Sequence, residues 1–93
     1  MATILIVDDD PTARMLLQDT LTRIGHEALT ANHVPEALHA LARTPVDLII
    51  SDYRMPGITG LEFLSMLTAE GYDIPVVMLT GHGGIQHAVA SIK

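Results

Sequence analysis

The chain has 93 residues, which limits it to one domain whose core only just offsets the conformational entropy lost on folding. Nearly half of the residues are hydrophobic, but no apolar run approaches the ~20 residues of a membrane helix, so we expect a globular protein outside the membrane. The net charge of −6 and the absence of cysteine exclude a basic nucleic-acid surface, disulfides and thiolate metal sites.

The first predicted unit is a strand followed by a helix. Thr3–Val7 is a short apolar run that ends at three aspartates, which is typical of a strand buried on both faces. Asp10 can cap a helix that has Pro11 at its first position, and apolar residues recur at helical spacing until Gly25. We therefore expect a parallel strand and a helix with one apolar face.

The second unit repeats this order. Glu27–Ala31 alternates weakly and predicts a strand, and Pro35 is suited to open the next helix. Pro45 prevents that helix from continuing. The residues expected to face inward are Leu38, Leu41 and Ala42.

The third unit carries the most distinctive residue. Val46–Ser51 predicts a strand that delivers Asp52 at its carboxyl end, and the proline and glycine of residues 53–57 mark a loop. Thr59 and Glu62 then have the spacing of a capping box, which predicts the start of a third helix.

The last unit is predicted from Ile74–Leu79, an apolar strand, and from the glycine-rich turn of residues 80–84. A fourth helix is expected after this turn. Its apolar residues would be Ile85, Ala88, Val89 and Ile92.

Alternating strands and helices predict a small doubly wound α/β domain with a parallel sheet of about four strands and about four helices. In such sheets, ligands bind just beyond the carboxyl ends of the strands. Four candidate site residues follow strands in this way: Asp8, Asp9, Asp52 and Thr80.

The acidic residues at this edge indicate a metal site. Carboxylates that converge repel one another, and a cation is needed if all are to remain ionised. Mg²⁺ suits Asp8, Asp9 and Asp52 because it prefers oxygen ligands and needs only one or two carboxylates plus a phosphate. A carboxylate beside such an ion can also act as a nucleophile toward phosphorus, and Asp52 is the natural candidate.

Three segments, around Asp8–Asp9, Asp52 and Thr80, together resemble the receiver domains of response regulators in two-component signalling. The segments are ILIVDDDP, LIISDYRMPG and PVVMLTGHG, and the resemblance spans essentially the whole chain. It implies a flavodoxin-like sheet and a domain that covers residues 1–93. It also implies a cytoplasmic signalling protein that is not an enzyme.

The resemblance assigns a role to each site residue. Asp52 would be the phosphorylated residue, and Asp8 and Asp9 would bind Mg²⁺ with the backbone carbonyl of Arg54. Thr80 would be the switch hydroxyl, and the Gly81 amide would contact the phosphoryl group. The phosphoryl donor would be a histidine kinase or a phosphotransfer protein.

Two features depart from the family. Thr59 replaces the acidic residue that usually precedes Gly60, and we expect little consequence because threonine preserves the helix cap. Receivers also continue into a fifth strand, which ends in a phosphate-binding lysine, and a fifth helix. Lys93 does not match that lysine. Without the fifth strand, Val76–Leu79 would be an exposed apolar edge, so we expect self-association through it.

Other functions remain open at this point. One is an interaction or dimerisation module that keeps the receiver scaffold but is not controlled by phosphorylation. A magnesium-dependent phosphatase is weaker, because no second catalytic acid follows Asp52. Residues 81–84 could hold a nucleotide phosphate but lack the Walker lysine, and the five histidines show no metal-ligand spacing.

Overall fold

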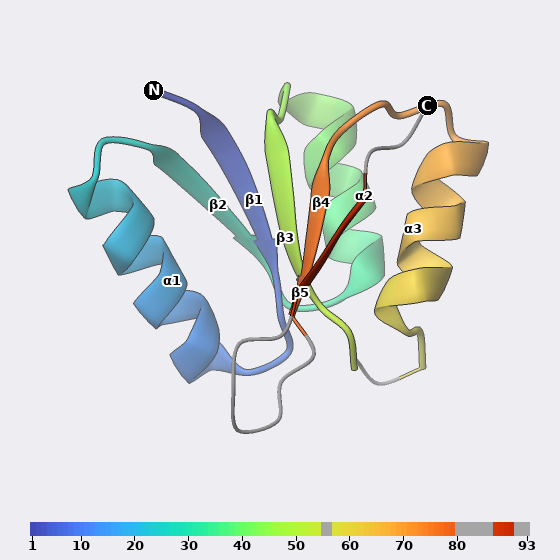
Figure 1. Cartoon of the computed structure of the whole chain (residues 1–93), viewed down its shortest axis with the longest axis horizontal. Helices are drawn as coiled ribbons and strands as arrows, with labels where there is room; N and C mark the ends of the chain where they lie inside the picture. The colour runs from blue at the N-terminus through green and yellow to red at the C-terminus, as the bar shows by residue number, and fades with distance from the viewer. Residues whose placement is uncertain (55–56, 80–86, 91–93) are drawn as a thin grey trace.

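The computed structural model describes residues 1–54 and 57–79 in full and the backbone of residues 87–90. The described strands form one sheet in the order β2-β1-β3-β4-β5 (Figure 1). The first four are mutually parallel, as predicted, and β5 runs antiparallel to β4. The strands are β1 (Thr3–Val7), β2 (Glu27–Ala31), β3 (Leu48–Asp52), β4 (Val76–Leu79) and β5 (His87–Ala90).

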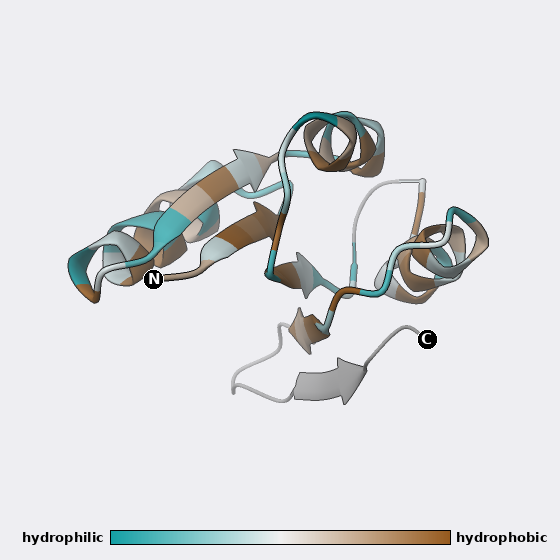
Figure 2. Cartoon of the chain, turned by 90° about the horizontal axis from the view of Figure 1, so that it is seen from above, coloured by the Kyte–Doolittle hydropathy of each residue, from teal (hydrophilic) through white to brown (hydrophobic). Residues whose placement is uncertain are grey.

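Three helices connect the parallel strands: α1 (Pro11–Arg23), α2 (Val34–Arg43) and α3 (Gly60–Ala69). Figure 2 shows α2 and α3 on one side of the sheet and α1 on the other. The core lies between the sheet and α2 and α3, and its largest buried side chains include Phe63, Leu5, Ile49, Leu67 and Val76. Helix α1 contributes less to the core than α2 and α3, since none of its residues is buried. Within the described residues, no helix combines the length and apolar character needed to cross a membrane.

The two predicted helix caps are confirmed. The Asp10 carboxylate accepts a hydrogen bond from the Thr12 backbone N–H at 3.0 Å. At the start of α3, the Glu62 backbone N–H donates to the Thr59 hydroxyl at 3.2 Å, and the Glu62 carboxylate accepts from the Thr59 backbone N–H at 3.0 Å. Both caps satisfy N–H groups that the first helical turn leaves without partners.

The predicted inward face of α2 is partly wrong. Leu41 is buried and Leu38 is partly buried, but Ala42 is exposed. The helix begins at Val34, one residue before the expected start, and Val34 and Ala37 are buried instead. Because buried positions recur every three to four residues in a helix, the series 34, 37 and 41 faces the sheet and position 42 faces solvent.

The predicted fourth helix is wrong over residues 87–90. Instead, His87–Ala90 forms β5, which pairs with β4 in a register from Val76↔Ala90 to Leu79↔His87. A short apolar run fits either a helix or a strand, and a neighbouring strand edge with unpaired backbone groups favours the strand. The rest of the expected helix, including Ile85 and Ile92, lies outside the described residues.

This pairing also corrects the expectation of an exposed β4 edge. The backbone of β4 is paired with β3 on one side and with β5 on the other. The reason given for self-association through Val76–Leu79 is therefore removed.

Candidate metal and phosphoacceptor site

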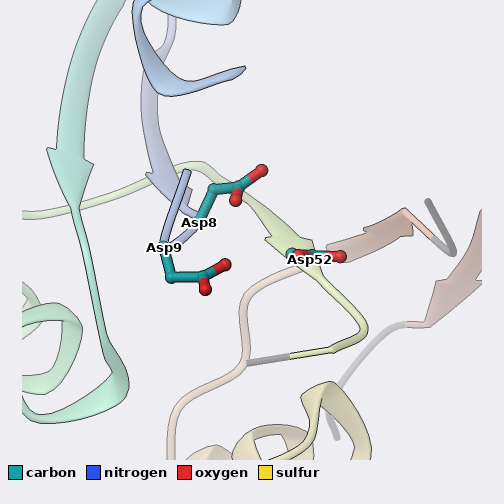
Figure 3. A group of neighbouring side chains, drawn as sticks. All are labelled: Asp8, Asp9 and Asp52. Carbon is teal, nitrogen blue, oxygen red and sulfur yellow. The ribbon is translucent and has the colours of Figure 1, made fainter. Parts of the chain in front are cut away.

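The candidate site lies where two adjacent strands end. Asp8 and Asp9 directly follow β1, and Asp52 is the last residue of β3. The two strands are parallel neighbours with Val7 opposite Ser51, so their carboxyl ends meet at one edge of the sheet. Figure 3 shows the three carboxylate side chains gathered there.

The three side chains are close enough to share one cation. Asp8, Asp9 and Asp52 each offer a carboxylate oxygen, and these oxygens all lie within 4.8 Å of one another. Their exposure differs, since Asp8 is 8% exposed, Asp52 is partly buried and Asp9 is exposed. The cluster is thus open to solvent on one side and anchored in the protein on the other.

Burial raises the pKa of the Asp8 carboxyl, and the negative charges of Asp52, Asp9 and Asp10 raise it further. The Asp10 backbone N–H acts in the opposite direction, because it donates to the Asp8 carboxylate at 2.9 Å and stabilises the charged form. The effects that raise the pKa outweigh the one that lowers it, so ionising the Asp8 carboxyl costs free energy unless a positive charge is nearby.

The donor set fits a hard divalent cation. All three groups offer oxygen, and no cysteine exists in the chain to favour a softer metal. A Mg²⁺ ion would relieve the repulsion between the acids and would keep part of its water shell on the exposed side. The arrangement therefore suits Mg²⁺ binding by Asp8, Asp9 and Asp52.

Two backbone contacts hold the acids in place. The Arg14 guanidinium donates through Nη1 to the Asp8 carbonyl oxygen at 2.7 Å, which ties α1 to the loop after β1. The Arg54 backbone N–H donates to the Asp52 carboxylate at 3.3 Å. The sequence suggested only the Arg54 carbonyl, as a metal ligand. It gave no local signal for the contact of Arg14 with the Asp8 carbonyl oxygen, which joins α1 back to the end of β1.

Gly60 is a second residue that sequence reasoning missed. Its backbone lies so close to β3 that a Cβ atom would stand 3.0 Å from the Asp52 carbonyl oxygen and 3.1 Å from the Tyr53 Cα, and would also clash with the Met78 sulfur. Its position directly after the Thr59 cap was visible in the sequence, but the approach to β3 is a property of the packed structure.

Thr80 and Gly81, the predicted switch hydroxyl and phosphate contact, lie outside the described residues. They follow β4, which is adjacent to β3 in the sheet. Their roles therefore stay predictions.

Comparison with known proteins identifies a family. Residues 4–93 match the model of the response regulator receiver domain. The chain is 37% identical to a chemotaxis protein CheY homolog of Campylobacter jejuni, over 97% of this chain and 72% of that protein. It is 41% identical to the transcriptional regulatory protein GlrR of Escherichia coli, over 99% of this chain. The chain spans only about a fifth of the length of GlrR and of the Pseudomonas aeruginosa regulators DctD and PilR.

Solved structures agree with this match. The N-terminal domain of a response regulator receiver protein from Methanoculleus marisnigri superposes with a TM-score of 0.83 at 39% identity, over 86% of this chain and 67% of that chain. The response regulator TrrA from Thermotoga maritima, solved in complex with Mg²⁺ and BeF, has a TM-score of 0.80 at 38% identity, over 89% of this chain and 72% of that chain.

Proposed function

Because the chain belongs to the family of response regulator receiver domains, we propose that Asp52 accepts a phosphoryl group from the phosphohistidine of a histidine kinase or phosphotransfer protein. The single observation that carries this proposal is the convergence of Asp8, Asp9 and Asp52 on one edge of the sheet. Acyl phosphate formation needs a carboxylate nucleophile beside a site for a cation, and this edge provides both.

In the transfer, a carboxylate oxygen of Asp52 attacks the phosphorus atom. The bond between phosphorus and the imidazole nitrogen breaks, the electron pair remains on that nitrogen, and an acyl phosphate forms on Asp52. The hydrogen bond from the Arg54 N–H to the Asp52 carboxylate helps to hold the nucleophile at the carboxyl end of β3. The protein's contribution is to orient the nucleophile and to balance charge.

Mg²⁺ would be held by Asp8, Asp9, Asp52 and the backbone carbonyl of Arg54. When bound, the ion supplies positive charge that offsets both the acids and the transferring phosphoryl group. The buried Asp8 carboxylate and its bond from the Asp10 N–H position one side of this site, and Arg14 secures the backbone beneath it.

After transfer, the Thr80 hydroxyl and the Gly81 amide would hydrogen-bond the phosphoryl oxygens, and the surface beyond β4 would change its affinity for partners. The domain would act as a cytoplasmic switch and not as an enzyme that turns over a substrate. The alternative of an interaction module that is independent of phosphorylation is not proposed, because the match to the receiver family and to response regulators does not favour it.

Phosphorylation is tested by intact-mass measurement after incubation with Mg²⁺ and a small phosphodonor. We expect one phosphate adduct in the unmodified protein and in Asp73→Asn, an exposed acid in the loop before β4. Asp52→Asn should carry none. An adduct that persists in Asp52→Asn, or no adduct with any donor, would contradict the proposal.

The need for a cation is tested in the same assay. Removal of Mg²⁺ with a chelator, or the substitution Asp9→Asn, should slow adduct formation strongly while circular dichroism still reports a folded protein. Equal rates with and without Mg²⁺ would separate Asp52 reactivity from the proposed metal site and would contradict the latter.

A further inference from the structure

A second candidate site lies away from the acidic cluster, between the outer edge of β2 and α2. It is a cavity of about 370 Å³. Strand β2 contributes Leu29 and Thr30 to its wall, and α2 contributes Glu36, His39, Ala40 and Arg43. None of these residues belongs to the proposed phosphoacceptor site.

The backbone of β2 is open on this side. In the described sheet β2 is an outermost strand and pairs only with β1 (Figure 1). The Glu27 N–H donates to Ala2 and the Ala31 carbonyl accepts from Asp8, so the alternate residues of β2 point their backbone groups toward β1. In a parallel ladder the intervening residues of β2, Ala28 and Thr30, point their backbone N–H and C=O groups away from β1.

Only part of this edge is covered within the described residues. The Gln18 side-chain amide of α1 donates to the Ala28 carbonyl oxygen at 3.1 Å. Thr30, which borders the cavity, is exposed, and its outward N–H and C=O make no described hydrogen bond within the protein. An extended peptide can pair with such an edge through its main chain and place one side chain in the adjacent cavity.

The charges on α2 indicate which kind of peptide side chain the cavity would favour. The Arg43 guanidinium donates to His39 Nε2 at 3.3 Å, and no described carboxylate forms an ion pair with Arg43. Since a guanidinium has five N–H donors, most of them stay available to a ligand. Glu36, the acid of this wall, is already bonded to the Asn32 backbone N–H at 2.6 Å.

We propose that the β2 edge and the adjacent α2 cavity bind an extended peptide segment of a partner protein, with an acidic side chain of the peptide directed at Arg43. Main-chain pairing with Thr30 would supply affinity, and the charge at Arg43 would supply selectivity. This binding is separate from phosphorylation and would leave Asp52 accessible.

The test is a titration followed by ¹⁵N–¹H correlation NMR of the full chain. The probe is a short blocked peptide of alternating threonine and valine with one central glutamate, and the matched probe has glutamine there. We expect shifts at Ala28–Ala31 and at the Arg43 side chain. The glutamine peptide, or the variant Arg43→Gln, should bind about fivefold more weakly or worse.

Two controls separate the contributions. Arg23→Gln removes an exposed cation from the last turn of α1, where it pairs with Asp19 at 2.9 Å, and should leave binding unchanged. A glutamate peptide that is N-methylated along its backbone should bind much more weakly, because it has no backbone N–H to donate to the Thr30 carbonyl oxygen.

Three outcomes would overturn the proposal. One is the absence of shifts at Ala28–Ala31, and another is equal binding by a peptide with central lysine. The third is the same set of shifts on raising protein concentration without peptide, which would mean that a second copy of the chain occupies the edge.

Discussion

The backbone N–H of Gly60 donates to the carbonyl oxygen of Tyr53 at 2.7 Å, which fastens the first turn of α3 to the residue directly after Asp52. This contact requires the two backbones to approach closely, and the Asp52 carbonyl oxygen and the Met78 side chain occupy the space where a Cβ would lie. The start of α3 therefore sets the position of the loop beside the acidic cluster.

Gly60→Ala should destabilise the protein by about 1 to 3 kcal/mol, since the added methyl group must displace backbone atoms. Helix propensity alone predicts the opposite sign. Urea unfolding measures the change. The control Ser65→Ala, at an exposed position of α3, should leave stability unchanged or raise it slightly. A Gly60→Ala variant as stable as the control would show that the approach to β3 is not tight.

The capping box at Thr59 gives a second prediction. Thr59→Ala removes the acceptor of the Glu62 N–H and should cost about 1 kcal/mol in urea unfolding. Thr59→Asp restores a side-chain acceptor and should recover most of that loss. If Thr59→Asp were as unstable as Thr59→Ala, the hydroxyl bond would not be the source of the effect.

If the proposed metal site forms, magnesium should stabilise the folded protein, because the ion would bind an arrangement of acids that the unfolded chain lacks. At about 100 times its Kd, the gain is about 2.7 kcal/mol, seen as a higher Tm in thermal unfolding. Asp9→Asn should abolish most of this gain, and Asp73→Asn should retain it. An equal gain in both variants would indicate that Mg²⁺ acts elsewhere.

The raised pKa of Asp8 predicts a pH dependence in the absence of metal. The folded state binds the Asp8 proton more tightly than the unfolded state, whose value is near 3.8. Stability from this group is therefore greatest below 3.8 and declines as pH rises through the raised folded pKa. At neutral pH the ionised carboxylate destabilises the fold.

Asp8→Asn removes this ionisation and can keep the bond from the Asp10 N–H. In chelator, the variant should be more stable than the original protein at neutral pH, and the advantage should shrink as pH falls toward 3.8. Urea unfolding at a series of pH values checks this. A variant that is less stable at neutral pH would mean that the carboxylate contributes favourably without metal.

Much of the fold followed from local pattern. The parallel strands and the three helices between them were predicted from local signals. These were the apolar run Thr3–Val7, the caps at Asp10 and Thr59, and the prolines and glycines that end strands and helices. The acidic site could also be predicted from the sequence, because parallel strands bring the residues at their carboxyl ends to one edge of the sheet. Asp8, Asp9 and Asp52 meet there.

Other features depend on contacts between separate elements of the fold. Whether His87–Ala90 forms a helix or a strand is decided by the free edge of β4, which no local periodicity encodes. The burial of Asp8, the reach of Arg14 to its carbonyl oxygen and the approach of Gly60 to β3 arise only when the elements pack.

By itself, the sequence thus determined the alternation of strands and helices, the helix caps and the identity of the three converging acids, because these follow from periodicity, side-chain hydrogen bonding and the direction of parallel strands. Tertiary structure alone decided the pairing of β5, the raised pKa of Asp8 and the open edge of β2. Each of these depends on how the packed elements bury side chains, bring charges together and leave strand edges without partners.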